Sequence, residues 1–220
     1  SADTVNANGA PVAIDINVTG DISISAVDVP ALTARTTGTG DAGAIQISSA
    51  DMDLTATAPN NLFVSAIDTH TSGSGKAGAV SITATNNLTM IGDPLSFVWV
   101  IDSGTSGLDG GHGGNVTLAA KHIDIETASI STGTNVANNL GEDATGSGGN
   151  LTINADSLNL TQAFLVTDNP TGPGGAGDIT ISARDVQINN FSALSATGFK
   201  NAGDIRITAD SLIVDSSQFE

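Results

Sequence analysis

One pattern of apolar residues recurs along the sequence at nearly fixed offsets. Each copy has a glycine followed by apolar residues two and four positions later, and in five of six copies a second apolar pair comes nine and eleven positions after that glycine. The second of these copies carries one extra residue, and an earlier, more divergent copy uses Ile14/Ile16 and Ile22/Ile24. Alternation with a period of two is typical of strands with one buried face. The six copies begin at Asp41, Lys76, Gly110, Gly148, Gly175 and Asn201.

The repeat predicts three short strands in each copy. A short break containing Ala, Asp, Asn or Ser separates the first two strands, and a third apolar stretch follows, as in Ala128–Ile130. Three such strands form one coil of a triangular prism, and successive coils stack in parallel about 4.8 Å apart. We therefore expect an all-β fold, a single-stranded right-handed parallel β-helix (β-solenoid) of about six to seven coils, whose handedness follows the preference of parallel crossovers.

The spacing between successive first strands varies, from 36 residues between Val80 and Val116 to 26 residues between Ile179 and Ile205. We expect the longer coils to carry corner loops, which a solenoid tolerates without disturbing its stack. A β-sandwich is the alternative, but it does not require the same apolar residues at the same offsets in every copy. We expect residues 1–220 to form a single β-solenoid segment, a fragment of a longer repetitive shaft.

Charge and composition narrow the function classes. The net charge is −17 with only six Lys and Arg, so the chain lacks the basic surface that nucleic acid binding requires. Aromatic residues make up 3 % and hydrophobic residues 39 %, which suits many thin layers of small aliphatic side chains. The absence of cysteine excludes disulfides and thiol chemistry, and no apolar run reaches transmembrane length.

The string GGNLTINADSLNL from Gly148, with related copies beginning AGD and AGA, resembles the repeat of bacterial haemagglutinin-like large exoproteins of the two-partner secretion type. The resemblance to these filamentous haemagglutinin-like repeats covers nearly the whole chain from about Ile14. It implies a structural or adhesive shaft on the extracellular or outer-membrane surface of a Gram-negative-type bacterium. It also implies partners: an outer-membrane secretion barrel for the parent protein, and a glycan or protein on a host or neighbouring cell.

The Asn-Pro-Asn type motif common in the secretion domain of that family is absent, so this segment resembles shaft and not export signal. The last copy stops at Glu220 after two strands, and we expect the natural protein to continue. The strand at Ser211–Asp215 has no cap in the sequence, and an uncapped end exposes unpaired backbone. We therefore expect either fraying of the last coil or end-to-end self-association.

Two aspartates are candidates for a polar site. Asp68 and Asp102 both follow an isoleucine in the third-strand region of neighbouring coils, and equivalent positions in a parallel stack lie about 5 Å apart. Stacked carboxylates raise each other's pKa or attract a cation, and Arg35 is the nearest basic residue in stacking terms. A polysaccharide-binding or polysaccharide-cleaving β-helix is therefore the alternative function. We expect exposed turn carboxylates, no enzyme and no cofactor, and we assign no catalytic or metal-binding residue.

The histidines and the glycine-rich turn give no metal site. His70, His112 and His122 show no pairing at metal-ligand spacing, so we expect solvated side chains at the surface. The segment GGHGGN, Gly110 to Asn115, is superficially similar to a calcium-binding nonapeptide, but that motif works in tandem and here it occurs once. A flexible corner is the expected structure.

Four aromatic residues and the two aspartates define a candidate carbohydrate or partner surface. If Val98 and Val100 face the core, then Trp99 and its neighbour point outward, and so do two further rings in adjacent coils. Exposed aromatic patches often mark binding surfaces, and flat rings suit sugar faces. The candidate surface consists of Phe63, Asp68, Phe97, Trp99, Asp102 and Phe164.

A second register remains open for these strands. Matching Ile67 and Ile101 to Ile130 would turn Phe97 and Trp99 into the core, because a slip of one residue reverses every side chain. A narrow lumen accommodates Trp poorly, so the sequence favours the outward register.

Overall fold

The computed structural model describes residues 13–59, 64–94, 98–106, 111–134, 145–170, 173–216 and 218–219. These residues form eighteen β-strands and no helix, which confirms the predicted all-β class. Accordingly, no described helix has the length and apolarity needed to cross a membrane. All pairings between the strands are parallel, as the repeat predicts, and the strands form two sheets.

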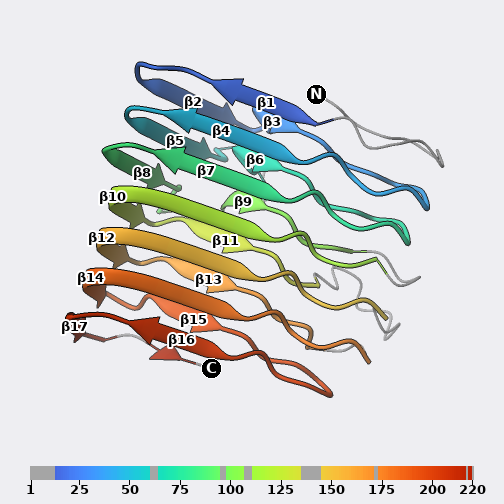
Figure 1. Cartoon of the computed structure of the whole chain (residues 1–220). Helices are drawn as coiled ribbons and strands as arrows, with labels where there is room; N and C mark the ends of the chain where they lie inside the picture. Colours follow the sequence, from blue (N-terminus) through green and yellow to red (C-terminus); the bar gives the residue numbers. More distant parts are fainter. Residues whose placement is uncertain are drawn as a thin grey trace.

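The larger sheet has eleven strands, and seven of them stack in the order β1-β4-β7-β10-β12-β14-β16 (Figure 1). Beside this path, β2 pairs with β5, β5 with β8, β8 with β10, and β17 with β14. The strands on the path are β1 (Ile14–Asn17), β4 (Ile45–Ser49), β7 (Val80–Ala84), β10 (Val116–Glu126), β12 (Leu151–Thr161), β14 (Ile179–Asn189) and β16 (Ile205–Thr208). The strands beside it are β2 (Ile22–Val27), β5 (Met52–Thr57), β8 (Asn87–Ile91) and β17 (Ser211–Val214).

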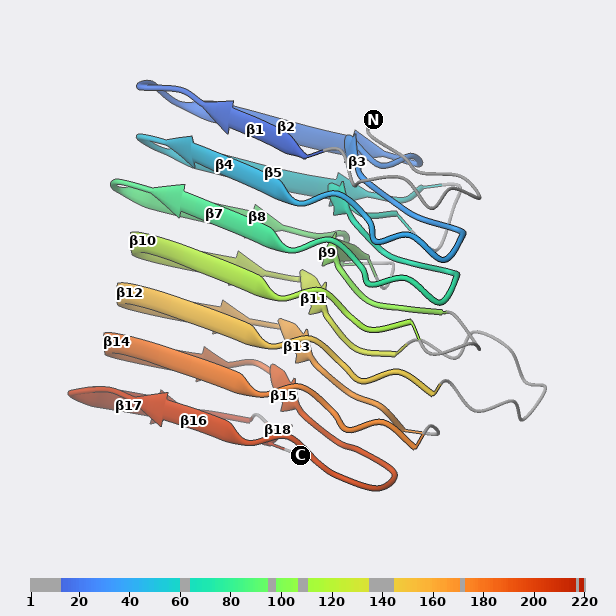
Figure 2. The same cartoon turned by 45° about the vertical axis from the view of Figure 1, so that its right-hand side comes forward.

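The smaller sheet has seven strands in the order β18-β15-β13-β11-β9-β6-β3 and lies alongside the first (Figure 2). Its strands are only two to four residues long. They are β3 (Leu32–Thr33), β6 (Ile67–Asp68), β9 (Trp99–Asp102), β11 (Ser129–Ser131), β13 (Phe164–Val166), β15 (Ala193–Ser195) and β18 (Gln218–Phe219).

The chain visits the two sheets in a fixed sequence. It runs along the larger sheet, crosses to the smaller one and loops out before it returns one strand further along the stack (Figures 1 and 2). We call each such passage a layer. Equivalent residues of neighbouring copies are strand partners: Ile45 pairs with Val80, and Val80 with Val116.

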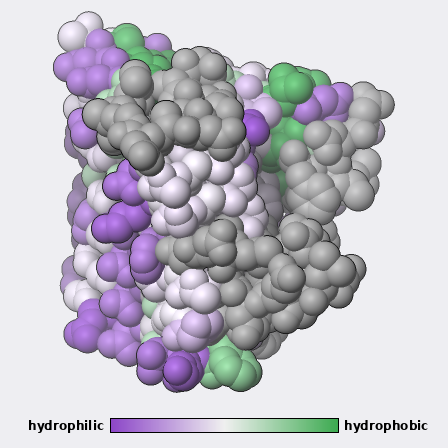
Figure 3. All heavy atoms as spheres, turned by 90° about the vertical axis from the view of Figure 1, so that its right-hand side faces the viewer, coloured by the Kyte–Doolittle hydropathy of each residue, from purple (hydrophilic) through white to green (hydrophobic). Residues whose placement is uncertain are grey.

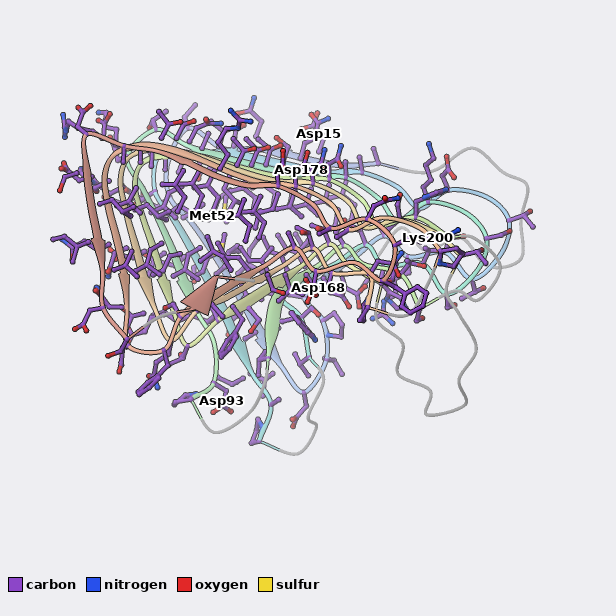
Figure 4. The ribbon with its side chains drawn as sticks, turned by 90° about the horizontal axis from the view of Figure 1, so that it is seen from below. Asp15, Met52, Asp93, Asp168, Asp178 and Lys200 are labelled. Atoms are coloured by element: carbon purple, nitrogen blue, oxygen red, sulfur yellow. The ribbon has the colours of Figure 1, made fainter. Side chains whose placement is uncertain are left out.

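The core consists of the aliphatic pairs that the repeat predicts. Their side chains point into the space between the sheets, as Met52 does in Figure 4. The buried pairs are Met52/Leu54, Leu88/Met90, Ile123/Ile125, Leu158/Leu160 and Val186/Ile188. The last predicted pair is an exception, because Leu212 and Val214 are 49 % and 43 % exposed. They lie on β17, which among the described strands pairs only with β14, so no layer in the described part of the chain covers them.

In three layers the structure has one continuous strand where the sequence predicts a break between the first two strands. β10, β12 and β14 each run for eleven residues across it, and the register of their pairings omits only Lys121, Asp156 and Arg184. The alternation instead changes phase within the strand: Leu118 and Ile123 are both buried although they are five positions apart, an odd number. Both halves of each strand thus bury apolar side chains, and the prediction of two separate strands is wrong for these layers.

A column of glycines lies where the chain returns from each loop, and it explains the glycine of the repeat. A Cβ at Gly78 would lie 1.9 Å from the carbonyl oxygen of Gly43, and one at Gly177 would lie 1.9 Å from that of Gly149. These contacts are closer than any side chain allows, so glycine is required for the backbones to approach. On the other side of the column, the hydroxyl of Thr69 donates to the carbonyl of Gly78.

Candidate functional site

The predicted pairing of the two aspartates is present in the smaller sheet. Asp68 ends β6 and Asp102 ends β9, and the two residues are strand partners. The side chain of Asp68 is only 8 % exposed, whereas Asp102 is half-buried. The expectation of freely exposed carboxylates is therefore wrong for Asp68.

Two basic side chains contact Asp68. Nε of Arg35 lies 2.9 Å from Oδ2 of Asp68. The Nε–H does not point along this line, so the contact is an ion pair and not a hydrogen bond. Nδ1 of His70 lies 2.9 Å from Oδ1 of Asp68, and the backbone N–H of His70 donates to the same oxygen at 3.1 Å.

His70 is thus a member of the site that the sequence did not identify. Its side chain is 27 % exposed and paired, so the prediction of a simply solvated histidine is wrong. One ligand atom from each of Asp68, His70 and Asp102 lies within 4.8 Å of the others. The signal in the sequence was the spacing Asp68-Thr69-His70, which puts the two polar side chains on one face of an extended strand.

The electrostatics of the cluster raise two pKa values. Burial raises the pKa of Asp102 to about 6, and the neighbouring Asp68 carboxylate adds to the effect. Burial by itself lowers the pKa of His70, but the hydrogen bond to Asp68 and the charges of Asp68 and Asp102 outweigh it, so the pKa is raised. The site therefore gains protons more readily than isolated side chains would.

The cluster balances most of its own charge. Arg35 and His70 contact both oxygens of Asp68, and Oδ1 of Asp102 accepts from the backbone N–H of Gly104 at 3.0 Å. A divalent cation would compete with Arg35 for Asp68, and it would be repelled by the guanidinium of that arginine. The arrangement is better suited to fixing three layers together and to titrating than to holding a metal.

A bulge in β9, the strand that contains Trp99, combines the two registers that the sequence left open. Trp99 pairs with Ser129, and Ile101 pairs with Ile130, so Val100 is the extra residue between them. Trp99 lies on the outward side and is partly exposed, while Val100 and Ile101 are both buried. The register with Trp99 outward therefore applies before the bulge, and the register that matches Ile101 to Ile130 applies after it.

A second ring lies in the same file as Trp99. Phe164 pairs with Ser129 from the opposite side and is also partly exposed. Ser129 between them is only 4 % exposed although it lies on the outward side, because large side chains flank it on both sides. Phe63 and Phe97, the other two predicted members of this surface, lie outside the described residues.

The other two histidines also have partners. Nδ1 of His112 accepts from the backbone N–H of Ser147 at 3.1 Å, and Nδ1 of His122 lies 2.7 Å from the Ser157 hydroxyl oxygen. The backbone N–H of Gly113 donates to the carbonyl of Ser147, so the glycine-rich turn belongs to the stack and is not a free corner.

A groove of about 640 Å³ runs over these turns, lined mainly by backbone and small side chains with Lys76, His112 and Ser147 among them. From the side on which the chain loops out, the described surface is mostly neutral in hydropathy, with hydrophilic residues along one border (Figure 3). The glycine N–H groups that line the groove already donate hydrogen bonds to neighbouring layers, as from Gly113 to Ser147 and from Gly148 to Gly175. We therefore assign no ligand to the groove.

No protein-family model, no curated protein and no solved structure matches this chain.

Proposed function

We propose that the chain is a right-handed parallel β-solenoid of about seven coils that serves as a structural and adhesive shaft on a bacterial cell surface. The observation that carries the proposal is the unbroken register of equivalent residues from Ile14 through Ile45, Val80 and Val116 to Leu151 and beyond. Each layer advances the stack by about 4.8 Å whatever the length of its loop. In such a fold, the length of the molecule increases with the number of layers in the chain.

The resemblance of the repeat to haemagglutinin-like exoproteins supports the surface location. In this proposal an outer-membrane barrel passes the unfolded parent chain outward, and the stack forms outside the cell. The net charge of −17 keeps an elongated protein of this kind soluble. A glycan or protein on a neighbouring cell is the proposed partner of the parent molecule.

The proposal is tested by removing one layer in register. Deleting residues 151–178 joins Asn150 to Ile179, and both flanking columns remain continuous because Leu151 and Ile179 are strand partners. We expect a folded protein that is shorter by about 4.8 Å in small-angle scattering. Deleting residues 151–164 removes part of a layer and serves as the control, which we expect to disrupt the stack.

The adhesive role needs the parent protein on its cell. Deleting residues 14–214 should reduce attachment to the target surface, and in-register removal of single layers should reduce it stepwise. Unchanged attachment after the large deletion would contradict the adhesive role, whereas the scattering result tests the fold alone.

A carbohydrate-binding face is the second candidate, and one observation favours it. Trp99 and Phe164 are partly exposed rings in one file, and Asp102 lies on the same strand as Trp99. Flat rings beside a carboxylate suit the apolar face and hydroxyls of a sugar. Asp68, also predicted for this surface, is only 8 % exposed and is contacted by Arg35 and His70, so we leave it out of the proposed binding face.

Tryptophan emission provides the test, because Trp99 is the only tryptophan. Titrating a panel of acidic and neutral polysaccharides should shift its emission and protect it from acrylamide. A Phe164→Ala variant should weaken that response, whereas Phe199→Ala, on an exposed loop residue, serves as the control. Unsaturated products would indicate cleavage, and no spectral change with any polysaccharide would remove this candidate.

A further inference from the structure

Two basic side chains lie on the outer face of the smaller sheet, in the layers next to Trp99. Arg35 follows β3, His70 follows β6 and Trp99 begins β9, and these three strands are neighbours in the sheet (Figure 2). The side chains of Arg35 and His70 are 34 % and 27 % exposed, whereas Asp68, which both contact, is only 8 % exposed. A ligand that approaches this face therefore meets the two basic groups before it meets the carboxylate.

We propose that Arg35 and His70 bind the carboxylate groups of an acidic polysaccharide whose sugar rings pack on Trp99 and Phe164. This inference rests on the carbohydrate-binding face given above as the second candidate function, and it adds the chemical class of the glycan and a dependence on pH. Asp68 lies beneath the two basic groups and positions them, and it does not itself contact the glycan.

A buried hydroxyl beside the cluster has no partner. Thr33 on β3 is the strand partner of Asp68 and is 9 % exposed, and its Oγ1 makes no hydrogen bond. Buried hydroxyl groups in native proteins are mostly hydrogen-bonded, and a partner from outside the fold is one explanation of an exception. An oxygen of a bound sugar would supply that partner. This observation does not depend on the charges, and it indicates a polar ligand at the same place.

The rings and the basic groups lie within reach of one oligosaccharide. The layers of Arg35, His70 and Trp99 follow one another, so two strand spacings, or about 10 Å, separate the first from the last. Along β9, Asp102 lies three residues after Trp99, which is also about 10 Å. A single sugar cannot contact a ring and both basic groups over this distance, so we expect a polymer to bind more tightly than its monomer.

Protonation reverses the net charge of the cluster. Burial raises the pKa of Asp102 to about 6, with a contribution from Asp68, and the pKa of His70 is raised as well. Below pH 6 Asp102 is neutral and His70 is charged, so Arg35, His70 and Asp68 leave one net positive charge. Above both pKa values Asp102 is charged and His70 is neutral, which leaves one net negative charge. The site therefore attracts an anionic sugar at acidic pH and repels it at higher pH.

Among the described residues, no other charged group contributes to the environment of Asp102. Asp68 and His70 lie on one side of it, and Arg35 lies one layer further. On the other side β11 places Ser131 opposite Asp102, and a serine does not titrate in this range. Across the core, β5 directs aliphatic side chains toward β9. The charge of the site is thus set by the four groups of the cluster.

The rest of the chain opposes an acidic ligand, because its net charge is −17. At physiological ionic strength, repulsion from charges more than about 8 Å away is largely screened. Contact with Arg35 and His70 therefore has to supply the attraction locally. We expect specific binding at this face and no general adsorption of acidic polymers to the chain.

A matched pair of polysaccharides tests the proposal. Polygalacturonate carries a carboxylate on each sugar, and its highly methyl-esterified form has the same backbone with most of that charge removed. By titration calorimetry, we expect the acidic form to bind about tenfold more tightly at pH 5 than at pH 7.5. The esterified form should bind equally at the two pH values.

The outcomes separate the two levels of the proposal. Equal binding of both polymers at both pH values would overturn the assignment of an acidic glycan and leave the carbohydrate-binding face intact. Binding of neither polymer, nor of any other polysaccharide, would remove the carbohydrate-binding face as well.

Variants locate the site. Asp102→Asn removes the carboxylate that charges at higher pH, so it should bind polygalacturonate more tightly than the parent at pH 7.5, a gain that misfolding cannot produce. Arg35→Gln should weaken binding at pH 5 by about tenfold. The controls are His122→Gln on β10 and Arg184→Gln on β14, both at exposed residues of the larger sheet, and they should bind like the parent. If Asp102→Asn binds no more tightly, or if the controls are weakened as much as Arg35→Gln, the proposed site is wrong.

Discussion

The two sheets differ in what holds their layers together. In the larger sheet, β10, β12 and β14 are eleven residues long and pair without irregularity, and their inward side chains are aliphatic. In the smaller sheet the strands are two to four residues long, one contains a bulge, and buried polar residues lie among the apolar ones. The regular sheet thus depends on side-chain burial, and the short-stranded sheet depends on additional polar contacts.

Hydroxyl groups make those polar contacts where the smaller sheet meets the glycine column. The buried side chains of Thr69 and Ser103 both donate to the carbonyl of Gly78. Thr132 donates to the carbonyl of Gly149 and Thr167 to that of Gly177, the equivalent glycines two and three layers further along. Because these hydroxyls satisfy carbonyls in the interior, the short strands need little apolar area of their own.

A charge in the regular sheet should have the largest effect. Ile181 on β14 is fully buried, and Ile181→Asp would place an unpaired carboxylate in the aliphatic interior. We expect a loss of about 3–5 kcal/mol in unfolding free energy, measured by denaturant titration. Ser182→Asp, at the partly exposed neighbouring position, is the control. A variant as stable as the parent would show that this strand face is assigned wrongly.

Adding a single methyl group in the glycine column should have the second largest effect on stability. Gly177→Ala would force the new Cβ against the carbonyl of Gly149 at 1.9 Å, so the two layers must separate locally. We expect a loss of about 3 kcal/mol in thermal or chemical unfolding. Gly20→Ala has no atom within 4 Å of its Cβ and should change stability little. Equal effects of the two substitutions would remove the steric role of the column.

The ionic cluster should respond to pH with a defined sign. The pKa of Asp102 is raised to about 6 in the folded chain. Protonation of this carboxyl therefore stabilises the folded state fully below the ordinary pKa of aspartate, and this stabilisation is lost as pH rises through 6. The raised pKa of His70 acts in the same direction at higher pH. Asp102→Asn keeps an oxygen for Gly104 and cannot ionise, so at pH 8 it should be more stable than the parent by about 1–2 kcal/mol.

The same substitution at the paired aspartate should have the opposite sign. Asp68→Asn removes the charge that Arg35 and His70 contact, and we expect a loss of about 1–3 kcal/mol at pH 8. Comparing the two variants between pH 4 and pH 8 separates an ionic network from general loss of packing. Parallel pH profiles for both variants and the parent would contradict the assigned roles.

The smallest expected effect concerns a corner between the sheets. Gln162 has a φ of 50° and Thr127 in the previous layer has the same value, which is the left-handed region that favours glycine. Gln162 is exposed, so Gln162→Gly loses no buried contact and should raise stability by about 0.5–1 kcal/mol. A gain in melting temperature would show it, with Gln46→Gly on a regular strand as the destabilised control.

The sequence predicts the regular sheet well and the irregular one only in part. The aliphatic pairs and the stacking of Asp68 on Asp102 follow from equal offsets in successive copies. His70 was missed because its partner depends on side-chain direction within a two-residue strand. The bulge at Val100 has no sequence signal, since the apolar residues on either side of Trp99 and at Ile101 fit both phases of alternation.

The corners and ends set further limits on prediction. Thr127 and Gln162 adopt left-handed backbone without glycine or asparagine to announce it, because the strands on both sides fix the corner. Leu212 and Val214 fit the repeat as core residues, yet they are exposed because burial requires a following layer. Periodicity therefore identifies which residues face inward, but it does not show whether a further layer covers them.

The direction of the interlayer hydrogen bonds has a mechanical consequence. They run along the stack axis, as from Ile14 to Ala44 and from Ile179 to Asp204, so a pull on the two chain ends loads them one layer at a time. Under tension the end layer would peel away before its neighbour bears much force. Each event would free the 26 to 36 residues between successive first strands, or about 90–120 Å of chain at ~3.4 Å per residue. A stretched molecule would thus lengthen in steps and dissipate a load that would otherwise reach its point of attachment.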